Sequence, residues 1–447
     1  MLQRLLVWFF TLTGRVFFRR IEVTGRERMP PGAVILLGNH PNSLLDPLLI
    51  ATTVNRPLAF AAKDGLFRQP GVGWIVRNAG GVSVQRRQDH GDVDNKAAFA
   101  ALDAVLEAGG AFGIFPEGIS HTGPELAPLK TGAARIALGA AARGVSLHVV
   151  PVGLTYWQRE RMRSKVLVHY GAPIPVLPPP PPPPGVDPDE HLRDVARVLT
   201  ARFEAALRGV TVNAPDFETQ RGLDVLRSVV APADAEGRDL RAQAEAARAV
   251  AEVWEARKDD PEMQALLAEA QAHARVLTAL DLDGDVLRDG LSRRAWILRL
   301  ARHALLLLVW LPLALPGIVL HAPPLLAAVL FGRRLSPRDD VQATTKMMMV
   351  TFFVLVTYLV LGLAIGIGLP FGRMMLAAGW GLVAVMLSGW AAVRVLERQS
   401  TLRHAARVTR QLWSAREVLA EVRAERAAMR ARFEALAEGM AEPAPVA

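Results

Sequence analysis

Two long apolar stretches near the C-terminus constrain the fold of this chain more than any other feature. Residues 347–369 and 374–393 each approach the roughly 20 apolar residues that a helix needs to cross a bilayer. Because lipid offers the backbone no hydrogen-bond partners, such stretches can form only helices or closed barrels. Residues 370–373 alone separate them. We therefore expect a transmembrane helical hairpin.

A third apolar stretch, residues 304–331, differs from these two because it contains Pro312, Pro316, Pro323 and Pro324. It is too short for two full crossings, yet arginines flank it on both sides. Two interpretations fit. It is either a re-entrant segment, broken at the prolines and covered by neighbouring helices, or one tilted span.

The basic residues around the hairpin predict its orientation, since positive charge accumulates on the cytoplasmic side of a membrane. Only Arg373 lies in the turn. Those that lie outside it are Arg333, Arg334, Arg338, Lys346, Arg394, Arg398 and Arg403. Both ends of the hairpin should therefore be cytoplasmic.

The N-terminal residues 1–20 form a shorter apolar run that Arg4 and Arg15 interrupt. No small-residue cleavage site follows, which argues against a secretory signal. We predict an amphipathic helix in the membrane interface, although a helix packed on its own domain is the alternative. The side chains expected to insert are Trp8, Phe9, Phe10, Phe17 and Phe18, and those expected to meet headgroups are Arg15, Arg19 and Arg20.

Short β-like runs alternate with helical patterns over residues 21–176, which predicts an α/β domain with a mixed, mostly parallel sheet flanked by helices. The expected strands are 21–25, 33–39, 80–84, 111–118, 146–156 and 165–171, and the expected helices are 43–53, 95–108 and 131–143. The runs 33–37 and 147–152 are continuously apolar, as in strands that are buried on both faces.

The remaining chain divides by composition. Residues 177–188 are a proline-rich linker, 189–300 a polar, alanine-rich helical region, and 301–396 the membrane region. Residues 397–447 form a charged tail. Its stretch 397–437 has the pattern of an amphipathic helix, which we expect to be solvated or self-associating.

Composition excludes several classes of site. The chain has no cysteine, so it cannot hold a disulfide, a thiolate zinc site, an iron–sulfur cluster or a cysteine nucleophile. Its histidines show no metal-ligand spacing. The net charge of +9 favours an anionic partner, either a membrane or a phosphorylated substrate. Nucleic acid is disfavoured, because no aromatic-interleaved basic run is present.

Residues 38–47, Gly-Asn-His-Pro-Asn-Ser-Leu-Leu-Asp-Pro, carry the first candidate for chemistry. His40 follows a buried strand, and the carboxyl end of a strand is where ligands bind in α/β sheets. Asp46 can accept a hydrogen bond from Nδ1–H of His40, which leaves Nε2 as a general base. Without a dedicated nucleophile, such a pair suits direct attack by a substrate hydroxyl. The simpler alternative is that His40 only caps a turn.

The spacing is the weak point of this pair. His40 and Asp46 are six positions apart, so they would lie on different faces of an ideal helix. They must therefore meet across a turn, and we expect Pro41–Asn42 to provide it before the helix begins.

Three further blocks follow: Gly80-Gly81-Val82-Ser83-Val84-Gln85-Arg86-Arg87, then Phe115-Pro116-Glu117-Gly118-Ile119-Ser120-His121, then Val149-Val150-Pro151-Val152-Gly153. With these four blocks in order, residues 1–215 resemble the glycerolipid acyltransferase superfamily. Residues 128–133 and 210–216 look like its glycerol-3-phosphate/dihydroxyacetone-phosphate branch. Three departures are the His–Asp spacing, commonly one residue shorter, Ser83 in place of the usual bulky or proline residue, and a shortened pattern before Ser120.

The resemblance implies roles for individual residues. His40 and Asp46 would be catalytic; Arg86 would bind the acceptor's phosphate, with Arg87 and Lys130 as auxiliaries. Glu117, Gly118 and Ser120 would orient the acceptor, Glu117 through glycerol hydroxyls or by holding the phosphate-binding arginine. Val150 and Pro151 would form a wall of the acyl-donor channel, although structural packing explains them almost as well.

The resulting expectation is a membrane-bound acyltransferase that transfers an acyl group from acyl-CoA or acyl-ACP to glycerol 3-phosphate. It would need no metal or other cofactor, and it would lie in the cytoplasmic membrane of a bacterium, multi-pass, with a cytoplasmic catalytic domain. Its partners would be the bilayer and its substrates, not nucleic acid. The alternatives are sn-2 acylation of lysophosphatidate and, in another class, an inactive lipid-binding or scaffold protein.

Overall fold

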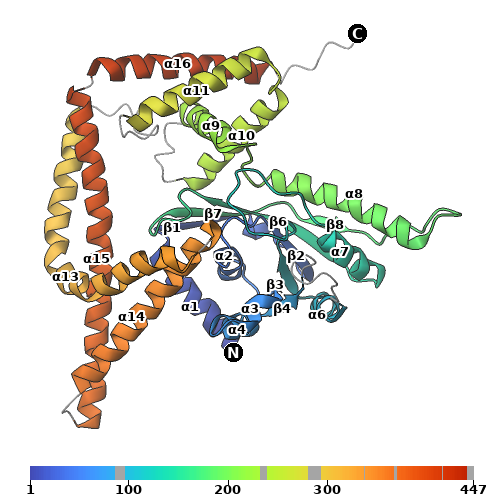
Figure 1. The fold of residues 1–447 in the computed structure, drawn as a ribbon, viewed down its shortest axis with the longest axis horizontal. Coiled ribbons are helices and arrows are strands. Elements are labelled where there is room, and N and C mark those ends of the chain that lie inside the picture. The colour runs from blue at the N-terminus through green and yellow to red at the C-terminus, as the bar shows by residue number, and fades with distance from the viewer. Residues whose placement is uncertain are drawn as a thin grey trace. The chain divides into compact units, whose positions relative to one another are not determined.

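The computed structural model describes residues 1–85, 96–231, 239–279, 293–336, 338–366, 370–414 and 416–439. The chain divides into two compact units (Figure 1). The first comprises residues 1–217 and the short segment 339–344, and the second comprises the remainder. Each unit is described by itself below.

An eight-stranded mixed sheet forms the centre of the first unit (Figure 1). Its strands are β1 (Arg20–Thr24), β2 (Ala33–Gly38), β3 (Leu58–Lys63), β4 (Gly81–Val84), β5 (Ala111–Ile114), β6 (Leu147–Tyr156), β7 (Lys165–Tyr170) and β8 (Ile174–Val176). The strand order is β1-β7-β6-β2-β5-β3-β4, with β8 pairing the start of β6. Only the pairings of β6 with β7 and β8 are antiparallel, so the predicted mostly parallel sheet is confirmed.

The parallel strands β6, β2, β5, β3 and β4 all end at one edge of the sheet. Two of the four sequence blocks, those that contain His40 and Glu117, follow the ends of β2 and β5. The loops after β2 and β5 begin at Asn39 and Phe115, and β6 ends at Tyr156. This topology brings residues from separate parts of the chain to one place, as in other open α/β sheets.

Helices cover both faces of this sheet. They are α1 (Leu2–Phe17), α2 (Leu45–Thr53), α3 (Asp64–Arg68), α4 (Val72–Asn78), α6 (Lys96–Glu107), α7 (Gly132–Ala142) and α8 (Pro188–Arg208), with a 3-10 turn η1 (Arg26–Arg28). Side chains of α6, α7 and α8 pack on the face that carries Ile35 and Leu37, while Ile50 of α2 packs beside Gly38 on the opposite face. Burial on both faces explains why β2 is continuously apolar.

The predicted strands and helices of this domain are present, and the sequence missed β3, β8, α3 and α4. Strand β3 reads Leu-Ala-Phe-Ala-Ala-Lys, and alanine and lysine are poor strand formers, so its local signal is weak. The strand expected over 111–118 ends at Ile114, where the Phe-Pro-Glu-Gly turn begins.

The N-terminal helix α1 packs on its own unit, which corrects part of the interfacial prediction. Phe10, Phe17 and Phe18, expected to insert into lipid, are buried in the protein. The opposite face nevertheless remains apolar and exposed, through Leu2, Leu5, Trp8, Leu12 and Val16. The amphipathic pattern shows that the helix has an apolar side that must be covered. It does not show that a second apolar side packs on the protein.

The first unit extends beyond the predicted domain boundary at residue 176. The proline-rich segment 177–187 contains no helix or strand and leads into α8. Asp187 caps this helix, and Ala196 and Phe203 bury its inner face in the core beneath the sheet. Therefore α8 belongs to the acyltransferase-like unit rather than to the following helical region.

The second unit contains the helices that follow residue 217, which are α9 (Phe217–Val230), α10 (Leu240–Ala256), α11 (Pro261–Ala279), α13 (Arg293–Arg334), most of α14 (Gln342–Gly366), α15 (Phe371–Ser414) and α16 (Arg416–Glu438). The 3-10 turn η2 (Asp339–Val341) and the first residues of α14 belong to the first unit. Among the residues that the structure describes, three helical stretches are long and apolar enough to cross a membrane: Leu300–Ala327, Asp339–Ala364 and Met375–Arg403. Residues 367–369 of the predicted hairpin lie outside the described residues.

The proline-containing stretch 304–331 lies within one continuous helix, α13, which Figure 1 shows bending along its length. The re-entrant segment and the single tilted span therefore both remain predictions for this stretch. Helix α15 packs along α13 and continues without a break past the predicted boundary at residue 396.

The charged tail is also corrected by the structure. The apolar stripe of α16, formed by Val422, Met429, Phe433 and Leu436, is buried. Polar contacts join the helix to its own chain: Glu425 lies 3.0 Å from the ring of His273 on α11, and Arg426 donates to Ser228 on α9. The stripe expected to be solvated or self-associating is therefore covered within the second unit.

Candidate active site

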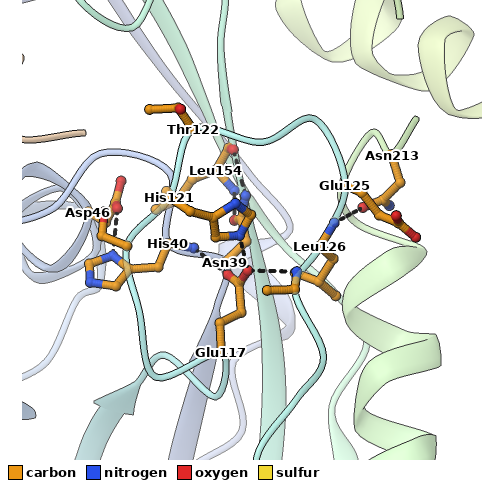
Figure 2. Close-up of polar contacts among 12 residues, drawn as sticks. Asn39, His40, Asp46, Glu117, His121, Thr122, Glu125, Leu126, Leu154 and Asn213 are labelled. Carbon is orange, nitrogen blue, oxygen red and sulfur yellow. Dashed lines mark hydrogen bonds and ion pairs between the residues drawn. The ribbon is translucent and has the colours of Figure 1, made fainter. Parts of the chain in front are cut away.

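The imidazole of His40 and the carboxylate of Asp46 meet despite their unusual spacing. Nδ1 of His40 lies 2.8 Å from Oδ2 of Asp46 (Figure 2). Asp46 is in the first turn of α2 and its side chain is completely buried, whereas 13% of the His40 side chain is exposed. The predicted contact is thus present, and its catalytic role remains a prediction.

A left-handed residue makes this contact possible. Ser43 has a φ of 48°, a conformation that non-glycine residues rarely adopt. The chain reverses through it, and α2 begins at Leu45. The backbone N–H of Ser43 donates to Oγ of Ser120 at 3.0 Å. The turn therefore lies one residue later than the predicted Pro41–Asn42, and a side chain of another block supports it.

Asp46 has two further hydrogen-bond donors. The backbone N–H of Asn42 donates to Oδ2 at 2.7 Å, and the hydroxyl of Tyr156 donates to Oδ1 at 2.7 Å. Burial raises the pKa of Asp46, while the hydrogen bonds from His40, Tyr156 and Asn42 act in the opposite direction. Sequence reasoning missed Tyr156; its position at the end of an apolar strand was the available signal.

Glu117 ties the loop after β5 to the loop that carries His40. Its carboxylate is buried, with only 2% of the residue exposed. Oε1 accepts the backbone N–H of His40 at 2.8 Å, and Oε2 accepts the N–H of Ala127 at 2.9 Å and the ring of His121 at 2.5 Å (Figure 2). The backbone N–H of His121 in turn donates to the backbone carbonyl of His40. These contacts give Glu117 a positioning role, and its predicted contact with the acceptor remains a prediction.

Gly118 and Lys130 lie together beside this turn. Gly118 has a φ of +70°, and a Cβ added there would lie 2.6 Å from Nζ of Lys130. Glycine tolerates this positive φ, and without a Cβ it leaves room for the lysine side chain. No other residue meets both requirements. Lys130 is exposed, so its ammonium group is accessible to a ligand.

Amide side chains hold the surrounding loops. Asn39 accepts the N–H of Leu154 at 2.7 Å and donates to its carbonyl at 3.1 Å, which clamps the loop after β2 to β6. Asn213, in the block at 210–216, accepts the N–H of Leu126 at 3.2 Å (Figure 2). That block therefore braces the segment that follows the Phe-Pro-Glu-Gly turn.

Val150 and Pro151 are buried within β6, between β2 and the antiparallel strands. Pro151 lies where the antiparallel partner of β6 changes from β8, which pairs residues 147–149, to β7, which pairs 152–156. A proline is tolerated there because the ladder already changes partner. This supports the packing explanation, and the channel wall remains a prediction.

Arg86 and Arg87 lie outside the described residues. They follow β4, whose end shares the sheet edge with the end of β2. The described ranges contain no group of three or more histidine, aspartate or glutamate side chains that could hold a metal ion.

Two family models match the chain. The Acyltransferase model matches residues 20–155, and the model of the glycerol-3-phosphate acyltransferase 2 C-terminal domain matches residues 233–443. The first match contains the contacts of His40, Asp46 and Glu117, and the second covers most of the second unit.

Several relatives are similar to part of this chain. Glycerol-3-phosphate O-acyltransferase 2 of Saccharomyces cerevisiae is 36% identical over 31% of this chain and 19% of that protein. Glycerol-3-phosphate O-acyltransferase 1 of the same yeast is 27% identical over 53% of this chain and 31% of that protein. This chain thus spans less than a third of either yeast relative. A 1-acyl-sn-glycerol-3-phosphate acyltransferase of Borreliella burgdorferi is 35% identical over 27% of this chain and 46% of that protein.

The crystal structure of the LPA acyltransferase PlsC from Thermotoga maritima is 25% identical, with a TM-score of 0.33, over 46% of this chain and 78% of that one. That score is too low to support a fold assignment by itself. The motif order, the mostly parallel sheet and the two matched family models all indicate an acyltransferase domain. The match to the Acyltransferase model is followed by the match to the glycerol-3-phosphate acyltransferase 2 C-terminal domain, so the predicted resemblance to the glycerolipid acyltransferase superfamily is confirmed.

Proposed function

We propose that this protein is a membrane-bound glycerol-3-phosphate O-acyltransferase of phospholipid synthesis, with acyl-CoA or acyl-ACP as the donor. The contact between His40 Nδ1 and buried Asp46 at the sheet edge carries the proposal. Within the described residues, Nε2 of His40 has no hydrogen-bond partner, so it is available to a substrate hydroxyl. The yeast relatives and the match at residues 233–443 support glycerol 3-phosphate as the acceptor.

The proposed reaction needs one base. Nε2 of His40 takes the proton from the acceptor hydroxyl as the oxygen attacks the thioester carbonyl carbon. The tetrahedral intermediate collapses with cleavage of the C–S bond, and the imidazolium returns its proton to the departing thiolate. Asp46 stabilises the imidazolium and holds the ring in the tautomer with Nδ1–H. The products are an ester and a free thiol, and the proton taken from the alcohol ends on the thiol.

The acceptor's phosphate requires positive groups, and Arg86 is proposed as its main contact, with Arg87 and Lys130 as auxiliaries. Arginine matches a phosphate through two parallel N–H donors, whereas lysine acts as a point charge. The accessible ammonium of Lys130 beside Gly118 supports its part in this assignment.

The second candidate is sn-2 acylation of lysophosphatidate. The likeness to the Borreliella burgdorferi 1-acyl-sn-glycerol-3-phosphate acyltransferase favours it. Both acceptors present a hydroxyl near a phosphate, so the same base and the same arginine would serve either reaction.

Attachment to the cytoplasmic membrane of a bacterium, by several passes and with the catalytic domain in the cytoplasm, completes the proposal. The three long apolar helices support membrane insertion. The exposed apolar face of α1, with the exposed arginines Arg4, Arg15 and Arg19 close by, suits the membrane interface. A lipid product can then leave sideways into the bilayer.

The test uses purified full-length protein in detergent with labelled acyl-CoA or acyl-ACP, and it measures thiol release and product. We expect turnover with glycerol 3-phosphate, its loss in His40→Ala without unfolding, and a raised acceptor KM in Arg86→Ala at little change in donor KM. A strong preference for lysophosphatidate would select the second candidate. Absence of His40-dependent turnover with either acceptor would instead indicate a lipid-binding or scaffold protein.

A further inference from the structure

Tyr156 lies in the site although none of the four sequence motifs contains it. It is the last residue of β6, and its hydroxyl donates to Oδ1 of Asp46 at 2.7 Å. The other oxygen, Oδ2, accepts from the His40 ring and from the Asn42 N–H. The two oxygens of the carboxylate are thus divided between the strand β6 and the His40 loop.

We propose that Tyr156 is a positioning residue for the reaction: its hydroxyl anchors Oδ1 of Asp46, so that Oδ2 stays aimed at Nδ1 of the His40 ring. This inference rests on the proposed function, because it assigns a role within the same site. In this role Tyr156 acts through Asp46, because its hydroxyl binds Oδ1 of that carboxylate.

The strand makes Tyr156 a rigid anchor. Strand β6 pairs with β2 on one side, and on the other side Tyr156 itself pairs with Val166 of β7. Its ring also lies beside the buried ring of Phe18, with centroids 6.0 Å apart. A group held by a sheet positions a carboxylate more reproducibly than a group on a loop does.

Electrostatics give this hydrogen bond a second effect. A completely buried carboxylate loses hydration, and donors must replace the lost water if it is to remain charged. Burial and the nearby Asp46 raise the pKa of Tyr156 well above its ordinary value, so the phenol keeps its proton and remains a donor. The other charged or titratable groups near the pair are Arg159, which interacts with Asp46, and Glu117 and His121, which bind the backbone of His40.

The matched experiment compares Tyr156→Phe with Tyr170→Phe in the full-length protein. Tyr170 is also buried, on the neighbouring strand β7, but its hydroxyl binds Thr53 Oγ1 at 2.8 Å and not Asp46. Each variant removes one phenolic hydroxyl and keeps the ring. Thermal unfolding checks that both remain folded, and the pH profile of kcat/KM reports protonation of the His40–Asp46 pair.

Without the Tyr156 hydroxyl, the Asp46 carboxylate loses one stabilising hydrogen bond. The His40–Asp46 pair therefore binds a proton more tightly. The pair is active when deprotonated, so its acidic limb should move to higher pH in Tyr156→Phe. We expect a shift of about one unit, the size that a hydrogen bond to a charged group produces. We also expect kcat on the plateau to fall several-fold at unchanged acceptor KM, while Tyr170→Phe leaves the limb in place.

A second measurement does not depend on how a variant folds. The chain has three tyrosines, so biosynthetic replacement by 3-fluorotyrosine is practical. This more acidic phenol is a stronger donor, and it should move the limb to lower pH.

The outcomes separate the two proposals. An unchanged limb in both Tyr156→Phe and the fluorinated protein overturns the role of Tyr156, provided that wild type turns over and His40→Ala does not. Absence of His40-dependent turnover in the wild type overturns the proposed function, and the role of Tyr156 with it.

Discussion

The imidazole of His40 lies face to face with the ring of Phe115, with centroids 4.1 Å apart and planes inclined by 13°. Phe115 stacks in turn on Phe60. A Cβ on Gly38 would lie 2.9 Å from Cε1 of Phe115, so a glycine is needed beneath this stack. The hydrogen bond to Asp46 fixes the rotation of the imidazole, and the stack fixes its plane.

The first prediction concerns this stack. Phe115→Leu keeps an apolar side chain but removes the flat face, so the imidazole can tilt away from the acceptor hydroxyl. Steady-state kinetics should show kcat reduced about ten-fold or more, since small misplacements of reacting groups are costly, with little change in acceptor KM. Phe203→Leu is the control, because Phe203 is more deeply buried than the partly buried Phe115 but lies among the α6, α7 and α8 side chains. Equal kcat losses in both variants would reject the orienting role.

The second prediction concerns the left-handed turn at Ser43. Ser43→Gly should keep activity and stability, since glycine adopts positive φ freely. Ser43→Val should lower the free energy of unfolding by about 1–2 kcal/mol, because a β-branched residue is strained there, and it should also lower kcat by moving Asp46. Thermal unfolding and thiol release check both variants. A Val variant as stable and active as the Gly variant would contradict the proposed strain.

The third prediction separates stability from function at Asp46. Asp46→Asn removes a buried charge, yet its amide can still accept from His40 and Asn42 and donate to the Tyr156 hydroxyl. We expect turnover to fall by about four orders of magnitude, as in the corresponding substitution of a catalytic triad. The unfolding temperature at neutral pH should be equal to that of the wild type or higher, because replacing a buried charge is often stabilising.

The pH dependence follows from the raised pKa of Asp46. A carboxyl whose pKa is higher folded than unfolded binds its proton more tightly in the folded state. Its ionised form therefore costs stability above that pKa, and the cost disappears as pH falls through it. The stability advantage of Asp46→Asn should shrink at mildly acidic pH. Asp103→Asn, at a partly exposed aspartate paired with Arg143, is the control and should give no advantage. A variant that melts well below wild type at neutral pH would contradict this prediction.

The fourth prediction concerns the crossing of α13 and α15. The hydroxyl of Ser388 donates to the carbonyl of Leu313 at 2.7 Å and accepts the N–H of Gly317 at 2.6 Å. In a regular α-helix these two backbone groups would bond to each other. Ser388 thus satisfies them at the bend of α13, as apolar surroundings require.

Gly317→Ala should disrupt this crossing, because its Cβ would lie 2.2 Å from the backbone oxygen of Ser388. Gly362→Ala in α14 is the matched control, since its Cβ would meet nothing within 4 Å and alanine favours helix by about 1 kcal/mol. In detergent, thermal unfolding should occur at a lower temperature in Gly317→Ala and at an unchanged or higher temperature in Gly362→Ala. Equal unfolding temperatures in the two variants would show that α13 and α15 can move apart at Gly317 without loss of stability.

Local patterns in the sequence predicted much of the first unit. Apolar runs identified the buried strands β2 and β6, because residues buried on both faces of a sheet need no polar alternation. The block around His40 was correctly placed at a strand end, whereas Glu117 was expected within a strand that in fact ends at Ile114. The long apolar stretches predicted helices, because a backbone in lipid must satisfy its own hydrogen bonds.

The sequence by itself determined most strands and helices of the first unit, although not β3, β8, α3 and α4, and it determined that a histidine and an aspartate lie near a strand end. Only the tertiary structure decided that Ser43 reverses the chain, that α16 is covered, and that Tyr156 reaches a carboxylate 110 positions away. The physical reason is that periodicity reports local conformation, whereas the partner of a buried polar group depends on which distant strands pair. That pairing, with β6 beside β2, brought the hydroxyl to the buried acid.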